Sequence, residues 1–175
     1  MLNAFLAGTE KRAYRLAYIA TQSNEDALDL VQEAMMTLAR RYAERDEGEW
    51  PLLFHRILQN KIRDWYRRQT VKNKIFSWFQ GDSDDGGNIE DNTIDTQTVE
   101  PERALQNENL GKAIEVALAK LPIRQQQTFL LRAWEGLSVN ETAEAMGISI
   151  GSVKTHYSRA IAALRTSLGT FYYEG

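Results

Sequence analysis

The side chains best suited to chemistry in this sequence are polar groups that can contact nucleic acid, gathered in residues 149–168. At the 3.6-residue period of a helix, one face of this segment is apolar and would pack inward, and it comprises Val153, Tyr157, Ala160, Ile161, Leu164 and Leu168. The opposite face begins with small and basic residues, which can enter a DNA major groove about 12 Å wide. This face comprises Ser152, Lys154, Thr155, His156, Ser158 and Arg159. The alternative is the solvated face of a plain helical bundle.

A second polar surface is predicted on a helix that begins near Pro51 and ends near Gln69. Its apolar residues share one side, and the opposite side carries a line of three arginines and one amide, Arg56, Asn60, Arg63 and Arg67. A line of cations is typical of a surface that follows a phosphate backbone. Aromatic rings beside such cations can stack on unpaired bases, and the neighbouring ones here are Trp50, Trp65 and Tyr66. The alternatives are core tryptophans, which we favour for Trp65, and solvated arginines.

The sequence lacks the residue groups that enzymes and metal sites need. It has no cysteine, and its two histidines, His55 and His156, lie far apart, which argues against disulfides and against thiolate or zinc sites. We find no clustered carboxylates, no glycine-rich phosphate loop, and no nucleophile with a base at a workable spacing. We therefore expect no catalytic residue, no metal and no cofactor.

Helical signals cover most of the chain, and no convincing strand alternation is present. Ser23 with Asp26, and Ser138 with Glu141, have the spacing of capping boxes at helix starts. Gly147 ends a short helix just before the last one, and two helices joined by a glycine turn are typical of a helix-turn-helix. The expected helices span about 3–20, 23–42, 51–69, 103–119, 122–136, 138–147 and 150–168.

Charge is segregated along the chain, although the net charge is only −3. Residues 52–79 hold seven basic residues and one acidic residue, whereas residues 80–102 hold eight acidic residues and no basic one. The acidic stretch is rich in Gly, Ser, Asp, Asn and Thr and has no sustained period, which predicts a flexible linker. The expected fold is therefore all-α, with helical domains at 1–79 and 103–175 joined by this linker, the second containing the helix-turn-helix.

The composition fits a soluble globular protein, at 43% hydrophobic and 26% charged residues. No apolar run approaches the ~20 residues that span a bilayer, and the first residues lack the order of a secretion signal. These features predict a cytoplasmic protein without membrane insertion. The outer face of the second helix is mixed and acid-leaning, and it is either solvated or a protein-docking face, with Asp29, Gln32 and Glu33 among its residues.

Both halves together resemble bacterial RNA polymerase sigma factors of the sigma-70 family, in the extracytoplasmic-function (ECF) class. DALDLVQEAMMTLARRY resembles the polymerase-docking part of the family's first conserved domain, and HRILQNKIRDWYRR resembles its promoter-melting, −10-reading helix. LPIRQQQTFLLRAWEGLSVNETAEAMGISIGSVKTHYSRAIAAL resembles the −35-reading domain. The resemblance covers roughly residues 5–70 and 103–168. Leu53-Phe54 and His156 depart from the usual residues, which leaves the promoter sequence open.

The resemblance implies a transcription initiation factor with no catalytic residue of its own. It implies that Asp29, Gln32 and Glu33 contact the clamp helices of the large subunit of core RNA polymerase, with the flap as a further contact. Arg56, Asn60, Arg63 and Arg67 would engage the −10 region, and the six polar residues of 152–159 the −35 duplex. An anti-sigma factor is a compatible partner, and polymerase binding would place the chain at the nucleoid. A stand-alone helix-turn-helix regulator would explain only the last 70 residues.

Overall fold

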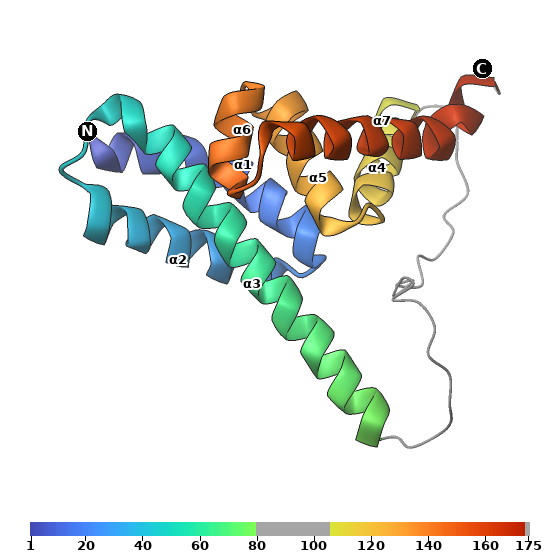
Figure 1. The fold of residues 1–175 in the computed structure, drawn as a ribbon, viewed down its shortest axis with the longest axis horizontal. Helices are drawn as coiled ribbons and strands as arrows, with labels where there is room; N and C mark the ends of the chain where they lie inside the picture. The colour runs from blue at the N-terminus through green and yellow to red at the C-terminus, as the bar shows by residue number, and fades with distance from the viewer. Residues whose placement is uncertain (80–105, 174–175) are drawn as a thin grey trace.

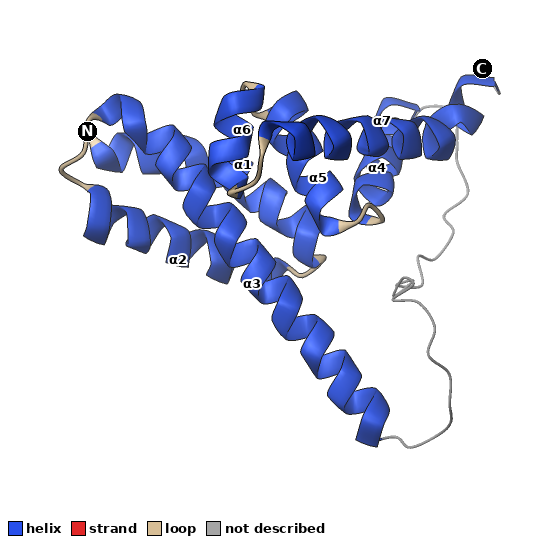
Figure 2. Cartoon of the chain, viewed as in Figure 1, coloured by secondary structure: helices blue, strands red, loops and turns tan. Residues whose placement is uncertain are grey.

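The computed structural model describes residues 1–79 and 106–173, and this part of the chain is all helices and turns, without a strand (Figure 2). The elements are α1 (Leu2–Thr21), α2 (Asn24–Tyr42), the 3-10 turn η1 (Glu47–Glu49), α3 (Trp50–Phe79), α4 (Gln106–Ala119), α5 (Ile123–Phe129), the π-helical turn η3 (Leu130–Trp134), α6 (Val139–Met146) and α7 (Ile150–Tyr173). The all-α prediction is confirmed. The predicted linker, residues 80–102, lies outside the described residues. No helix of the described part is both long and apolar enough to cross a membrane.

Helices α1, α2 and α3 pack around one another in the first half of the chain. The predicted cap of α2 is present, because the side chain of Ser23 accepts a hydrogen bond from the backbone N–H of Asp26 at 3.2 Å. The inner residues come from all three helices and include Leu16, Ile19, Leu30, Leu38, Phe54, Leu58 and Ile62. Leu28 is apolar but 45% exposed, since it lies 100° around the helix from the buried Ala27.

Helix α3 is longer than the sequence predicts. It was expected to end near Gln69, but it continues to Phe79. The core-facing period is lost after Trp65, yet no glycine or proline follows before Gly81, so nothing in the sequence breaks the helix. Residues 71–79 are all exposed. The last helix, α7, also extends beyond the expected end at 168, to Tyr173.

The turns of the second half follow the predicted capping signals. Ser138 and Glu141 form a complete capping box, with the backbone N–H of each bonded to the side chain of the other at 3.2 and 3.1 Å. Gly147 ends α6 with φ 65°, a left-handed conformation that costs glycine little. Ser149 then accepts a hydrogen bond from the Ser152 N–H at 3.1 Å at the start of α7. These local bonds set the turn that makes α6 and α7 a helix-turn-helix.

The second half lies directly against the first, with α6 next to α3 and α4 in contact with α1 (Figure 1). One apolar core includes residues of both halves, among them Leu118, Leu121, Leu130 and Leu164 beside the core residues of α1–α3. Two buried hydrogen bonds cross the boundary. Gln127 Nε2 donates to the Gln59 carbonyl at 3.1 Å, and Gln59 and Gln127 are each 2% exposed. Gln126 Nε2 donates to the Ile19 carbonyl at 3.5 Å. We call this boundary the seam.

Candidate nucleic-acid interface

The predicted recognition face lies on the first turns of α7, opposite a buried anchor. Val153 and Ala160 are fully buried, and Tyr157 stacks on Phe129 with ring centroids 6.1 Å apart. These contacts hold α7 on α5 and turn its polar side outward. Of the six predicted residues, two are half-buried, Ser152 and His156, and four are exposed: Lys154, Thr155, Ser158 and Arg159.

Ser152 and His156 are less free than the other four residues of this face. The Ser152 hydroxyl oxygen accepts a 2.9 Å hydrogen bond from the Ser149 hydroxyl, so it takes part in the helix cap. Burial lowers the pKa of His156 below its usual 6.5, and the nearby charges of Arg124 and Arg159 lower it further. A neutral imidazole at pH 7 can donate at one nitrogen and accept at the other, which suits a base edge better than a phosphate.

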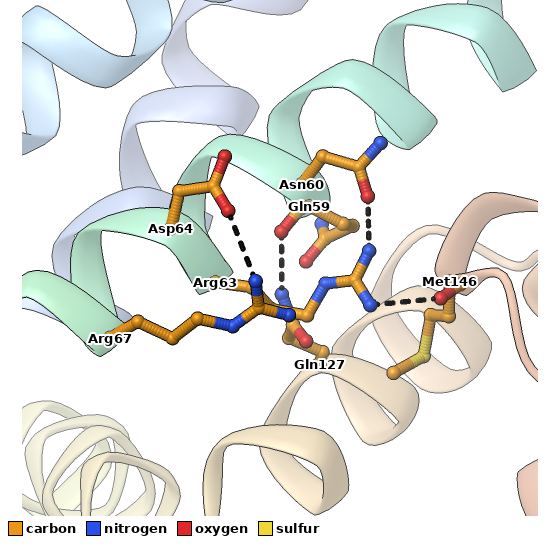
Figure 3. Close-up of polar contacts among 7 residues, drawn as sticks. All are labelled: Gln59, Asn60, Arg63, Asp64, Arg67, Gln127 and Met146. Carbon is orange, nitrogen blue, oxygen red and sulfur yellow. Dashed lines mark hydrogen bonds and ion pairs between the residues drawn. The ribbon is translucent and has the colours of Figure 1, made fainter.

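The predicted line of polar residues on α3, which we call the α3 stripe, comprises Arg56, Asn60, Arg63 and Arg67. These residues differ in how exposed they are and in their contacts within the protein. Arg56, Asn60 and Arg67 are exposed, whereas Arg63 is half-buried at the seam. Arg63 donates to the Met146 carbonyl at 3.1 Å and to the side-chain oxygen of Asn60 (Figure 3). Arg63 would have to give up both hydrogen bonds in order to contact DNA. Arg67 lies 3.7 Å from Asp64, an exposed ion pair that DNA can displace at small cost.

Arg124 is a residue of this surface that sequence reasoning missed. Burial lowers the pKa of Arg63, and the charges of Arg124 and Arg67 add to that effect, against Asp64, which raises it. Arg124 also lowers the pKa of His156, so it lies close to both predicted DNA surfaces. Only its position two residues after Pro122, in the first turn of α5, was visible in the sequence. Its closeness to Arg63 and His156 arises from the fold, because both residues are distant from Arg124 in the sequence.

The three aromatic residues near the stripe have different positions. Trp50 is 5% exposed and its indole N–H donates to the Tyr42 carbonyl at 3.1 Å, so its ring is closed off from an incoming base. Trp65 is half-buried and packs against the core, as we favoured. Tyr66 is 42% exposed and remains available at the surface. Tyr66 therefore remains a candidate for stacking on a base, whereas Trp50 does not.

The outer face of α2 is exposed and carries more than the predicted polar residues. Asp29, Gln32 and Glu33 all face solvent, and Glu33 lies 3.6 Å from Lys61 of α3. Leu28 and Met36 lie among them on the same side and are 45% and 49% exposed. Exposed apolar side chains between acidic ones are typical of a protein-docking surface. Leu28 and Met36 lie four residues before and after Gln32, and this spacing, which puts them on its side of the helix, was the missed signal.

Comparison with known proteins identifies the family of this chain. Residues 8–71 match the family model for sigma-70 region 2, and residues 111–164 match the model for sigma-70, region 4. The ECF RNA polymerase sigma factor SigX of Bacillus subtilis is 29% identical over 157 residues, which cover 87% of this chain and 75% of SigX. The RNA polymerase sigma-E factor of Streptomyces coelicolor is 31% identical over 144 residues, which cover 82% and 72% of the two chains.

A solved structure has the same fold over nearly the whole chain. It is that of the sigma factor RpoE in complex with the anti-sigma factor NepR from Bartonella quintana, which superposes with a TM-score of 0.65 over 95% of this chain and 96% of that chain, at 20% identity. The two matched regions occur in the same order as the two predicted surfaces. Together with the relatives, they show that this chain belongs to the sigma-70 family of RNA polymerase sigma factors, in its ECF class.

Proposed function

We propose that this transcription initiation factor, which directs core RNA polymerase to promoters, divides its contacts among three surfaces. The observation that carries the proposal is the pairing, in one chain, of an outward polar face on α7 with a line of cations on α3. A single DNA-binding helix would suffice for an operator-binding regulator. Two separate surfaces fit a protein that holds two promoter elements at once.

The α7 face engages the −35 duplex. A recognition helix enters the major groove through its first turns, and the residues of α7 there have no bulky side chain that would obstruct it. The proposed contacts are those of Ser152, Lys154, Thr155, His156, Ser158 and Arg159. Lys154 and Arg159 suit phosphates or guanine edges, and the others suit base edges.

The α3 stripe engages the −10 region, where the promoter opens. An opened duplex exposes unpaired bases, whose backbone attracts cations and whose rings stack on aromatic side chains. The proposed contacts are Arg56, Asn60, Arg63 and Arg67, with Tyr66 as the exposed ring. Because Arg63 is bonded across the seam to Met146, we expect the halves to separate, at least locally, when it binds DNA.

The α2 face docks on core polymerase through Asp29, Gln32 and Glu33, on the clamp helices of the large subunit. The exposed Leu28 and Met36 support this assignment, because they add apolar contact to an acidic face. A contact of the second half with the flap belongs to the same proposal. An anti-sigma factor is a further partner that the proposal accommodates.

The test is transcription by sigma-free core polymerase supplied with the purified chain. We expect specific RNA from a promoter library, and a gel shift on promoter duplex that is weak without polymerase and strong with it. A stand-alone regulator would bind duplex DNA by itself as a dimer and would not program the polymerase. Failure to start RNA from every promoter in the library would refute the proposal.

Arg159→Ala should weaken binding of the holoenzyme to promoter duplex by about 1–3 kcal/mol, if the guanidinium reads a base edge with two bonds. The measurement is a filter-binding titration on promoter fragments with intact and substituted −35 elements. Arg165→Ala is the matched control, since Arg165 is exposed on the same helix but lies about 9 Å farther along its axis than Arg159, beyond the first turns that enter the groove. If the two variants bind promoter DNA with equal affinity, Arg159 does not read a base and is only a solvated side chain.

Glu33→Lys should lower the affinity for core polymerase while the fold is kept. Glu33 is 55% exposed and its pair with Lys61 is partly exposed, so loss of the pair costs at most ~1 kcal/mol of stability. Competition with a labelled sigma factor for core polymerase measures the affinity. Glu10→Lys reverses a charge on the exposed side of α1 and serves as the control. Unaltered competition by Glu33→Lys would contradict the docking assignment.

A further inference from the structure

The end of α3 carries an unusual concentration of exposed apolar side chains. Within residues 71–79, which we call the α3 arm, five large side chains are more than half exposed: Val71 at 54%, Ile75 at 51%, Phe76 at 64%, Trp78 at 84% and Phe79 at 85%. The arm projects away from the packed helices (Figure 1). The region 2 family model ends at residue 71, so all of the arm except Val71 lies beyond that match. Exposed apolar surface of this kind marks a binding site.

The charge of this part of the helix indicates an anionic partner. From Trp65 to Phe79 the sequence has four cations and no acidic residue, and the cations are Arg67, Arg68, Lys72 and Lys74. A partner that fits must therefore offer negative charge together with flat or apolar groups. Nucleic acid with unpaired bases offers both, because its phosphates attract the cations and its bases stack on aromatic rings.

The arm also continues the α3 stripe in phase. Lys74 follows Arg56 by eighteen residues, and Trp78 follows Asn60 by eighteen, which is five turns at 3.6 residues a turn. Lys74 and Trp78 therefore lie on the same side of the helix as the proposed −10 contacts. An amphipathic membrane helix would instead segregate its cations from its aromatic residues. Here the most exposed indole shares the face of the cations.

We propose that the α3 arm binds single-stranded DNA, with the indole of Trp78 stacked on an unpaired base and Lys74 on a backbone phosphate. The inference rests on the proposed function in taking the strand from the opened promoter. Duplex DNA fits the arm poorly, because its bases are stacked on one another and offer no free ring face. The arm thus lengthens the proposed −10 surface beyond the stretch that the region 2 family model matches.

The first test measures affinity of the full chain for labelled single-stranded and duplex oligonucleotides by fluorescence anisotropy. Trp78→Ala should weaken single-strand binding about tenfold, as expected for loss of one base–aromatic stack, and leave duplex binding unchanged. Trp78→Phe should retain most of the affinity. Trp134→Ala is the matched control, since Trp134 is a partly exposed tryptophan of the second half. Lys74→Gln should reduce the salt dependence by about 0.7 of a log unit per decade of salt.

The second test uses holoenzyme on duplex and pre-melted forms of one promoter. Trp78→Ala should slow initiation on the duplex and lose affinity for the pre-melted form, whereas affinity for core polymerase stays unchanged. If the Trp78→Ala variant binds single-stranded DNA as tightly as the wild type does, the inference is wrong. If the same protein still starts transcription with core polymerase, the proposed function is unaffected. A loss confined to core-polymerase affinity, or to binding of anionic lipid vesicles, overturns it as well. Absence of any transcription refutes the proposed function and leaves the first test to decide the inference.

Discussion

Phe54→Ala lowers the free energy of unfolding by about 3–5 kcal/mol, as expected for a fully buried phenylalanine. Phe54 is 0% exposed in the core that residues of both halves share, and its ring meets that of Phe5 edge-on with centroids 6.2 Å apart. Alanine leaves a cavity there and removes this aromatic contact. The loss also affects function, because Phe54 holds the segment of α3 that presents Arg56 and Asn60.

Urea denaturation followed by circular dichroism measures this effect. Phe76→Ala is the matched control on the same helix, since Phe76 is 64% exposed and its loss should change stability by no more than ~0.5 kcal/mol. Phe54→Leu provides a milder variant if the alanine variant does not fold. Similar midpoints for Phe54→Ala and Phe76→Ala would contradict the position of Phe54 in the core.

The capped helix ends could be predicted because their signals are local. Ser138 and Glu141 meet across one turn, and Gly147 adopts the left-handed conformation that its residue type favours. The anchoring side of α7 follows for the same reason, since a 3.6-residue period separates buried Val153 and Ala160 from exposed Lys154. The faces proposed to bind DNA were thus deducible from spacing alone.

The seam could not be predicted, because its contacts join residues far apart in the sequence. Gln59 and Gln127 are polar and would be expected at the surface, yet each is 2% exposed and their bond spans 68 residues. Arg63 was assigned to DNA from its place in the stripe, and the period could not reveal that it also reaches Met146. The end of α3 was missed for a different reason, since an exposed arm has no core-facing pattern to detect.

Glu135→Ala should cost about 3 kcal/mol at neutral pH, because the carboxylate bonds two groups of the other half at once. Its Oε2 atom lies 2.9 Å from Arg12 Nη2 and 3.3 Å from His55 Nε2. The Glu135 and His55 side chains are each 8% exposed, whereas Arg12 is 62% exposed. A bond to a charged group contributes about 1.5–3 kcal/mol, and we expect most of the loss from the covered His55 contact. Glu144→Ala, an exposed glutamate of α6, is the control.

The stability from Glu135 should also disappear in acid. Burial alone would raise its pKa, but the hydrogen bond and charge of His55, with Arg12, outweigh burial and place the pKa below its usual 4.5. A carboxyl group with a lowered folded-state pKa stabilises the fold above its unfolded pKa and ceases to do so as the pH falls through the folded value. Urea denaturation at pH 7 and again well below pH 4.5 should therefore show a large gap between wild type and Glu135→Ala that shrinks in acid. A gap of constant size would mean that Glu135 acts through packing and that its charge does not hold the two halves together.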